Sequence, residues 1–248
     1  MSNASKLTFL NILFWILIFL CIGLFCSMHF IKFNPYGSIG YASEVCCCIA
    51  CVLSFILSKN KVNFWLAMGL LFTISADVFL VLLQSQKMLA MFLFSVTQIS
   101  YFIAVSYISG SKKQFLSDLI LRIVAFILLC FVAWMILGSA FSLLVVISLF
   151  YFSNELFNTI FSVINIKKCP LLFCGLLLFL MCDIIIGLHV LTSIISVPTL
   201  ASVLAVLNTY FDLAWVFYIP SQLLISLSAI KYAKKSIRKK DFIVNNMK

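Results

Sequence analysis

Residues 69–101 read GLLFTISADVFLVLLQSQKMLAMFLFSVTQISY, and this stretch contains the pattern that decides the fold. Two apolar runs flank the polar turn QSQK, which indicates two helices joined by a tight connection. The first run carries one acid, Asp77, and the second returns with Gln98 and Tyr101. A carboxyl group is costly to bury among apolar side chains, so Asp77 is a candidate functional residue.

The same pattern returns later in the chain as GLLLFLMCDIIIGLH, residues 175–189. Asp183 follows Gly175 by eight positions, as Asp77 follows Gly69. Each Asp is about 12 or 13 residues past the start of its predicted helix, or roughly 20 Å at ~1.5 Å per residue. The two acids are therefore expected at one depth, and the repeated motif suggests an internal four-plus-four duplication of helices.

The composition of the whole chain is that of an integral membrane protein. The chain has 248 residues, of which 65% are apolar and 10% charged, and its mean hydropathy is +1.22. A soluble domain carries about a quarter charged residues. The apolar runs are continuous and do not alternate, which favours transmembrane helices over a membrane β-barrel.

We predict an all-α bundle of eight transmembrane helices in one domain, residues 1–230, followed by a basic tail, residues 231–248. Pro220 falls inside the last helix and is expected to kink it. The predicted helices are Thr8–Ile31, Tyr41–Ser58, Phe64–Leu83, Met88–Ile108, Phe115–Leu137, Ala140–Ile164, Leu171–Ile194 and Leu200–Ile230.

Lysine and arginine lie almost entirely on one side of the predicted bundle. The other side has only Lys32 and Lys87. Such a bias marks the cytoplasmic side, so both termini are predicted to be cytoplasmic. The host is the inner membrane if the chain is bacterial and an endomembrane if it is eukaryotic. The basic tail favours contact with anionic lipid headgroups over nucleic-acid binding.

The ten cysteines favour no cofactor or metal site. Nearly all lie within the apolar runs, and no pair has a His or further Cys at zinc spacing. Buried Cys behaves as a small apolar residue. The helical pair Cys47 and Cys51 is the one candidate for a further role.

Four acids fall inside the predicted spans: Asp77, Glu155, Asp183 and Asp212. An acid at the centre of a membrane helix costs ~2.5–3.5 kcal/mol and usually marks function. Asp118 and Arg122 are spaced to pair with each other, and Glu44 is expected to reach headgroups or water. Other polar residues form helical stripes that could line a cavity with the acids, and we select Gln98, Tyr101, Asn158, Tyr218 and Gln222 as candidate substrate-binding residues, together with Glu155 and Asp212.

Two carboxyl groups in one cavity suit acid/base chemistry. In a low dielectric one can remain protonated as an acid while the other is ionised as a base. Glycosidic acetals are hydrolysed by such a pair through an oxocarbenium-like state. A vinyl ether can be hydrolysed by related logic, with protonation at carbon followed by attack of water.

Four segments resemble the lysoplasmalogenase, or YhhN-like, family of eight-span membrane proteins. They are LLFTISADVFLVL (70–82), FSVTQISYFIA (94–104), GLLLFLMCDIII (175–186) and FYIPSQLLISLS (217–228). The family typically shows S-x-x-G-D-x-x-L, G-H-x-x-Y, G-x-x-x-F-x-x-S-D and Y-x-x-x-Q segments in this order. In this chain Thr73 and Ala76 stand for the first Ser and Gly, Cys182 for the Ser before the second Asp, and Thr97-Gln98 for Gly-His.

The resemblance implies that Asp77 and Asp183 are the catalytic acid pair, surrounded by Gln98, Tyr101, Tyr218 and Gln222. It implies hydrolysis of the vinyl ether bond of a lysoplasmalogen to a fatty aldehyde and a glycerophospho-headgroup. It implies no cofactor and no metal.

Three other functions fit parts of the pattern. A proton-coupled carrier also uses intramembrane acids, but it is expected to interrupt its helices with Gly or Pro at the acids. An intramembrane aspartyl protease would need G-x-G-D, where this chain has I-S-A-D. A lipid-binding protein without catalysis remains a further alternative.

Overall fold

The computed structural model describes residues 2–31, 38–194, 202 and 213–246, and the regular elements among them are all helical. Eight helices of this part are long and apolar enough to cross a membrane, which confirms the predicted all-α class and number of spans. The helices are α1 (Asn3–Phe30), α2 (Ser38–Ser58), α3 (Lys61–Asp77), the π-helical turn η2 (Val78–Leu82), α4 (Lys87–Ser109), α5 (Lys112–Leu137), the 3₁₀ turn η3 (Gly138–Ala140), α6 (Leu143–Ile164), α7 (Pro170–Ile194) and α9 (Leu213–Asn246).

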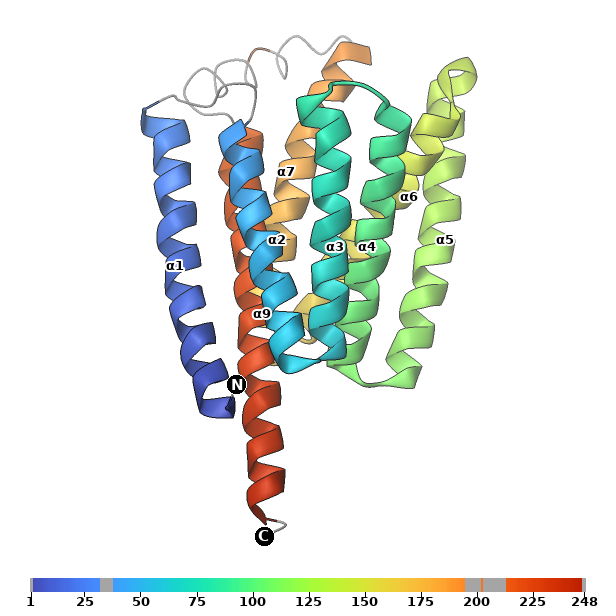
Figure 1. The fold of residues 1–248 in the computed structure, drawn as a ribbon. Coiled ribbons are helices and arrows are strands. Elements are labelled where there is room, and N and C mark those ends of the chain that lie inside the picture. The colour runs from blue at the N-terminus through green and yellow to red at the C-terminus, as the bar shows by residue number, and fades with distance from the viewer. Residues whose placement is uncertain (1, 32–37, 195–201, 203–212, 247–248) are drawn as a thin grey trace.

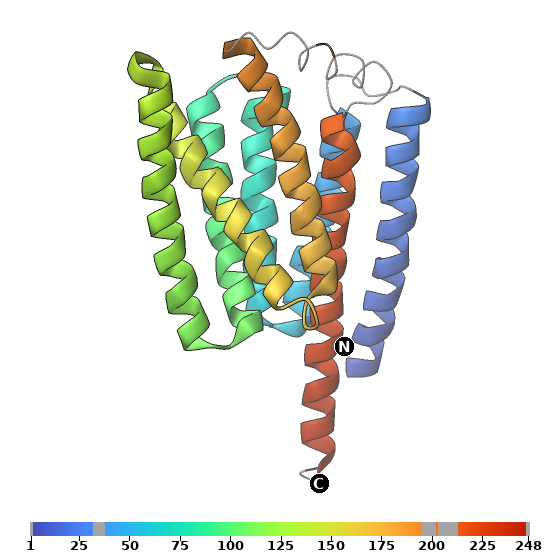
Figure 2. The same ribbon diagram turned by 180° about the vertical axis from the view of Figure 1, so that it is seen from behind.

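Six of these helices form a ring in which each packs against its two neighbours, in the order α2, α3, α4, α6, α7 and α9. The closest partners in the ring are α3 with α4 and α7 with α9. The remaining two helices lie outside it on opposite sides, with α1 against α2 and α9, and α5 against α6 (Figures 1 and 2). The side chains that enter the ring are therefore shielded from lipid.

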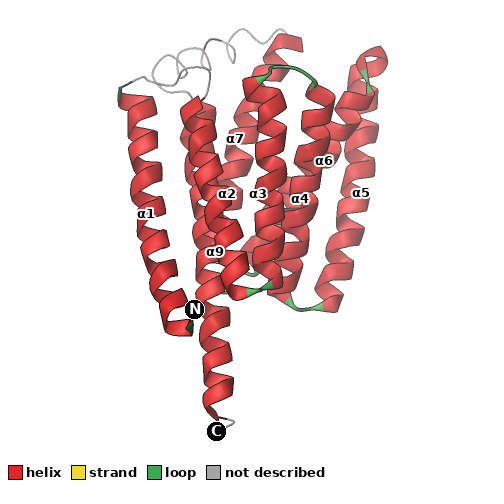
Figure 3. Cartoon of the chain, in the orientation of Figure 1, coloured by secondary structure: helices red, strands yellow, loops and turns green. Residues whose placement is uncertain are grey.

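Local sequence explains where the helices end. Asn60 caps α3, because its side chain accepts a hydrogen bond from the backbone N–H of Val62 at 2.9 Å. Gly110 ends α4 with φ of +69°, a left-handed conformation that costs glycine little. Ser111 then caps α5 by accepting from the backbone N–H of Gln114 at 3.3 Å. These caps allow the short turns between consecutive helices seen in Figure 3.

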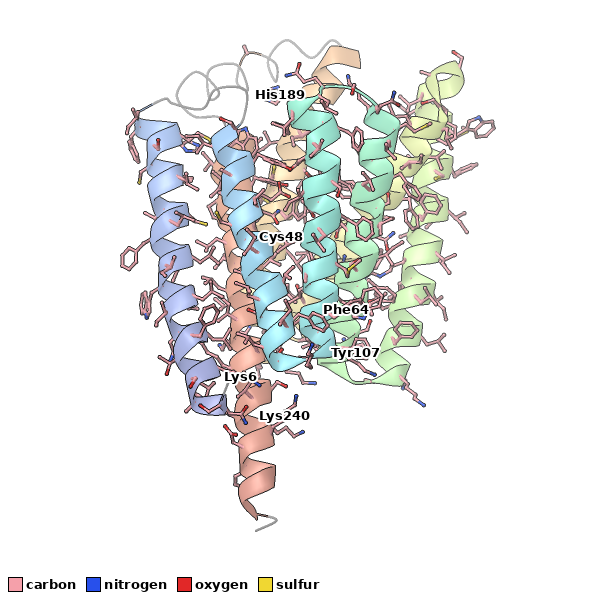
Figure 4. The ribbon with its side chains drawn as sticks, viewed as in Figure 1. Lys6, Cys48, Phe64, Tyr107, His189 and Lys240 are labelled. Carbon is pink, nitrogen blue, oxygen red and sulfur yellow. The ribbon has the colours of Figure 1, made fainter. Side chains whose placement is uncertain are left out.

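Both chain ends lie at the same end of the bundle. Lys6 and Lys240 lie at that end and His189 at the other (Figure 4). Residues 231–246, which we predicted as a tail, continue α9 beyond the neighbouring helices (Figure 1). The extension is anchored, since Asn3 donates a hydrogen bond to Asp241 and Lys240 Nζ donates to the backbone oxygen of Ser58 at 2.9 Å.

Two glycines allow the close approach of the paired ring helices. A Cβ atom at Gly69 would lie 2.3 Å from Cε1 of Tyr101 in α4. A Cβ atom at Gly175 would lie 2.8 Å from Cγ1 of Ile225 in α9. Thr97 Oγ1 also donates to the backbone oxygen of Gly69 at 3.2 Å. Small residues at such contacts are typical of membrane helix packing.

We predict that Gly69→Ala destabilises the protein, because the added methyl group overlaps the buried ring of Tyr101. Overpacking of this kind costs about 1–3 kcal/mol. Thermal unfolding of the purified protein in detergent measures the effect. The matched control is Gly23→Ala in α1, where a Cβ atom has nothing within 4 Å. The control is expected to unfold at or slightly above the wild-type temperature, and an equal loss in both variants would contradict the packing argument.

Candidate active site

A cavity of about 450 Å³ lies between α3, η2, α4, α6, α7 and α9. Among its described wall residues the acidic ones are Asp77 and Asp183, and most of the others are apolar. The wall consists of Asp77, Leu80, Val81, Met91, Phe94, Ser148, Leu149, Tyr151, Phe152, Phe179, Cys182, Asp183, Ile186, Gly187, Ala214, Trp215 and Tyr218. The structure thus brings the two predicted catalytic acids to one cavity.

Asp77 is the last residue of α3, and its side chain is buried with 4% exposure. Tyr218 of α9 donates a hydrogen bond from its hydroxyl group to the Asp77 carboxylate. The Tyr218 ring is held edge-on against Phe179 and Trp215, with ring centroids 5.7 and 5.4 Å away. This packing fixes the hydroxyl group that orients Asp77.

The backbone hydrogen bonding changes directly after Asp77. The N–H of Leu83 donates to the oxygen of Val78, five residues earlier, at 2.8 Å. The helix predicted over residues 64–83 does continue to Leu82, but its last turn, η2, is π-helical and not α-helical. Such turns are rare and often occur at functional sites. Leu80 and Val81 of this turn form part of the cavity wall.

Asp183 lies within α7, and its carboxylate accepts a hydrogen bond from the hydroxyl group of Tyr151 in α6. The Tyr151 ring packs against Phe94, with centroids 5.5 Å apart. Tyr151 was not among the site residues predicted from the sequence. Each aspartate accepts a hydrogen bond from a tyrosine, but one tyrosine lies in α9 and the other in α6. The surroundings of the two aspartates are therefore not identical.

Each aspartate also has a glutamate beside it. Glu44 of α2 lies within hydrogen-bonding reach of Asp77, and Glu155 of α6 within reach of Asp183. Both glutamates have 0% exposure. The prediction that Glu44 reaches headgroups or water was wrong, because the side chain points into the ring. Its position six residues after the start of α2, close to the depth of Asp77, was the signal that could have identified it.

Gln98 and Asn158 lie in a polar network between helices and are not among the described wall residues of the cavity. Asn158 Nδ2 donates to Gln98 Oε1 at 2.8 Å. Arg122 of α5 donates to Asn158 Oδ1 at 3.0 Å and to Asp118 Oδ1 at 2.6 Å, which is the predicted Asp118–Arg122 pair. The guanidinium group also stacks on Phe102, 4.5 Å from its ring centroid. The network attaches α5 to α4 and α6.

The remaining predicted site residues have separate places. Tyr101 is fully buried with its ring against Gly69. Gln222 is fully buried in α9, where its Nε2 donates to Ser221 Oγ at 3.3 Å. Neither is among the described wall residues of the cavity. Asp212 lies outside the described residues. Of the predicted substrate-binding side chains in the described part, Tyr218 is the one on the wall.

The arrangement places four carboxyl groups where ionisation is costly. Two unit charges about 4 Å apart repel by roughly 4 kcal/mol at an effective dielectric constant of about 20. Groups in this situation gain or lose protons readily when a ligand changes the local charge. The geometry is therefore suited to proton transfer. Among the described residues, no three His, Cys, Asp or Glu side chains are grouped closely enough to hold a metal ion.

Comparison of the chain with protein-family models, with curated proteins and with solved structures finds no match.

We predict that Arg122→Met destabilises the bundle by about 3–5 kcal/mol, because Asp118 is left as a buried charge without its partner. The combined change Asp118→Leu with Arg122→Met removes both charges and is expected to recover much of this loss. Thermal unfolding in detergent measures both. Arg238→Met changes an exposed arginine of α9 and serves as control. A double variant as unstable as the single one would contradict the role of the ion pair.

Proposed function

We propose that the protein is a membrane-embedded hydrolase that cleaves the vinyl ether bond of a lysoplasmalogen by acid/base catalysis with Asp77 and Asp183. The observation that carries this proposal is that both carboxyl groups face one apolar cavity, each oriented by a buried tyrosine. Two carboxyl groups on opposite sides of a cleavable C–O bond are the usual equipment for reactions through an oxocarbenium ion.

The cavity supports a lipid substrate. Its volume of about 450 Å³ lies within the range of ~300–1,000 Å³ typical of small-molecule sites. Aromatic and aliphatic side chains from the turn η2 and from four helices, α4, α6, α7 and α9, line it, including Phe94, Phe152 and Phe179. Such a wall suits the alkenyl chain of a single-chain lipid, and the two acids then lie along its polar end. The resemblance of the segments 70–82, 94–104, 175–186 and 217–228 to lysoplasmalogenases supports the same substrate.

The reaction uses one proton from the site and one water molecule. One aspartic acid gives its proton to the outer carbon of the vinyl ether, whose double-bond electrons form the new C–H bond and leave an oxocarbenium ion. Water adds to the carbon beside oxygen while the other aspartate takes its proton, which gives a hemiacetal. When the hemiacetal collapses, the C–O bond to the glycerol breaks, its hydroxyl proton passes to the leaving oxygen, and the aldehyde is released. Proton transfer between the two acids through water resets the site.

The tyrosines keep the two acids in position during these steps. A hydroxyl group that donates to a carboxylate holds that carboxylate in one orientation at the cavity wall. Because Tyr218 comes from α9 and Tyr151 from α6, the two aspartates differ in their surroundings. This difference suits a site in which one aspartate acts as acid and the other as base.

We propose that α1–α4 and α5–α9 are two copies of one four-helix unit. Each half has a glutamate on its second helix and an aspartate eight residues after a glycine on its third. On the fourth helix, Gln98 and Gln222 precede by three residues the side chains that pack on those glycines, Tyr101 and Ile225. The ring contacts agree with this relation, since α4 packs against α6 as α9 packs against α2.

The lysine-rich end of the bundle is proposed to face the cytoplasm, with both termini there and the basic extension of α9 near anionic headgroups. The support is the one-sided distribution of lysine in the connections. With this orientation the cavity acids lie nearer the opposite, non-cytoplasmic surface.

A proton-coupled carrier is the second candidate function. The observation that favours it is the π-helical turn directly after Asp77, because carriers interrupt their helices at ion-binding sites. Aldehyde release by protein in detergent supports the hydrolase. Solute flux that requires a sealed vesicle, without aldehyde release, would support the carrier.

We predict that Asp77→Asn and Asp183→Asn each lower the rate of aldehyde release by at least about a hundredfold, because general acid or base catalysis is lost. The assay uses purified protein in detergent with a lysoplasmalogen and a coupled aldehyde dehydrogenase. Asp241→Asn, an identical change on the α9 extension, is expected to keep the wild-type rate.

Full activity in Asp77→Asn or in Asp183→Asn would exclude the two-aspartate mechanism. The unfolding temperature of each variant is measured beside its activity, so that loss of fold is separated from loss of chemistry.

A further inference from the structure

Glu44 and Glu155 are the two glutamates of this chain, and both lie beside a proposed catalytic aspartate. Each is fully buried. They come from α2 and α6, the helices that precede the aspartate helices α3 and α7 in the chain. A buried glutamate beside an aspartate therefore occurs twice, each time on the second and third helices of one half of the chain.

No N–H or O–H group of the described residues donates a hydrogen bond to either glutamate carboxyl. The tyrosine hydroxyl groups donate to the aspartates instead. Among the described residues, the hydroxyl group of Tyr218 also lies within reach of Glu44, but its single proton is donated to Asp77. What remains for each glutamate is the neighbouring aspartate, which in its ionised form is also only an acceptor. Two facing carboxyl groups can form a hydrogen bond only when a proton lies between them.

The geometry points to Glu44 and Glu155 as positioning residues, each of which shares one proton with its aspartate, Glu44 with Asp77 and Glu155 with Asp183. The pairs keep a transferable proton at the cavity wall although no basic side chain lies on the described wall. The catalytic consequence rests on the proposed hydrolase function, whereas the proton sharing does not.

In the reaction the pair that acts as acid gives its proton to the vinyl ether carbon and is left with two negative charges. The positive oxocarbenium ion forms beside it at the same moment, so the added charge on the pair stabilises the cation. The other pair already holds one proton, and its free oxygen takes a second from the attacking water. The proton count of the two pairs together is unchanged over this sequence.

Selective labelling tests the proton sharing without any substitution. Because the chain has two glutamates, protein labelled with ¹³C at the glutamate carboxyl carbon gives signals from Glu44 and Glu155 alone. Nuclear magnetic resonance at neutral pH is expected to place both signals between the positions of a free carboxylate and a free carboxylic acid. Two signals at the carboxylate position would overturn the inference.

Glu44→Gln and Glu155→Gln test the consequence for catalysis and assign the two signals. Glutamine supplies an N–H donor of nearly the same shape, so the aspartate no longer needs the shared proton and stays ionised. One of the two glutamine variants changes the pair that protonates the vinyl ether. In that variant kcat is expected to fall about a hundredfold with KM unchanged. Glu44→Asp and Glu155→Asp retain a carboxyl group and are expected to retain more activity than the glutamine variants. Wild-type kcat in both glutamine variants would contradict the role in catalysis.

The two proposals fail in different ways. Intermediate carboxyl signals in a wild-type protein that releases no aldehyde would leave the proton sharing in place and reject the hydrolase. Aldehyde release by a protein whose two glutamates are fully ionised would support the hydrolase and reject the proton sharing.

Discussion

The rest of the structure depends on the enclosure of four carboxyl groups within a ring of apolar helices. Asp77, Glu44 and Glu155 are buried and Asp183 is partly buried, and all four lie among side chains that offer them few donors. Such groups persist only where the scaffold holds them against the cost of desolvation. The tyrosines offset part of the desolvation cost by donating hydrogen bonds to the aspartates. The proton shared within each glutamate–aspartate pair offsets another part, because it removes one negative charge. The features that make these residues expensive are the same ones that suit them to proton transfer.

The scaffold around the acids is correspondingly rigid. Gly69 and Gly175 bring α3 and α7 close to α4 and α9. Each helix that carries an aspartate is therefore packed tightly against a neighbour at a point eight residues before that aspartate. The Arg122 network holds α5 against the ring from outside and keeps Gln98 within a helix interface. The α-helical hydrogen bonding gives way next to the cavity, at the π-helical turn after Asp77. A binding site in a helix bundle needs a firmly packed scaffold that holds its side chains in place. The glycine contacts supply that packing away from the cavity, and the π-helical turn changes the backbone beside it.

Much of the fold could be predicted from the sequence because burial in a membrane leaves a simple pattern. The eight apolar runs predicted the eight spanning helices. The eight-residue spacing from Gly to Asp, found twice, predicted that Asp77 and Asp183 lie at the same depth, and both line the cavity. Other features depend on contacts between helices that the sequence does not display. Gln98 in α4 and Asn158 in α6 were expected to line the cavity, but their side chains contact each other between the helices and are not among the described wall residues. Glu44 was misplaced because it lies near the start of α2, where depth is sensitive to a boundary of a few residues. The π-helical turn leaves no Gly or Pro in residues 77–83 to reveal it.

The central claim is that a carboxyl group fixed in the cavity delivers a proton to carbon. Hydrolysis of a lysoplasmalogen in D₂O by the purified protein, with the aldehyde trapped at once by reduction to the alcohol, tests this most directly. The account predicts one deuterium per molecule at the carbon next to the former carbonyl carbon, with a single configuration, because the acid approaches from one face. Product without deuterium at that carbon, or with equal amounts of both configurations, would contradict it.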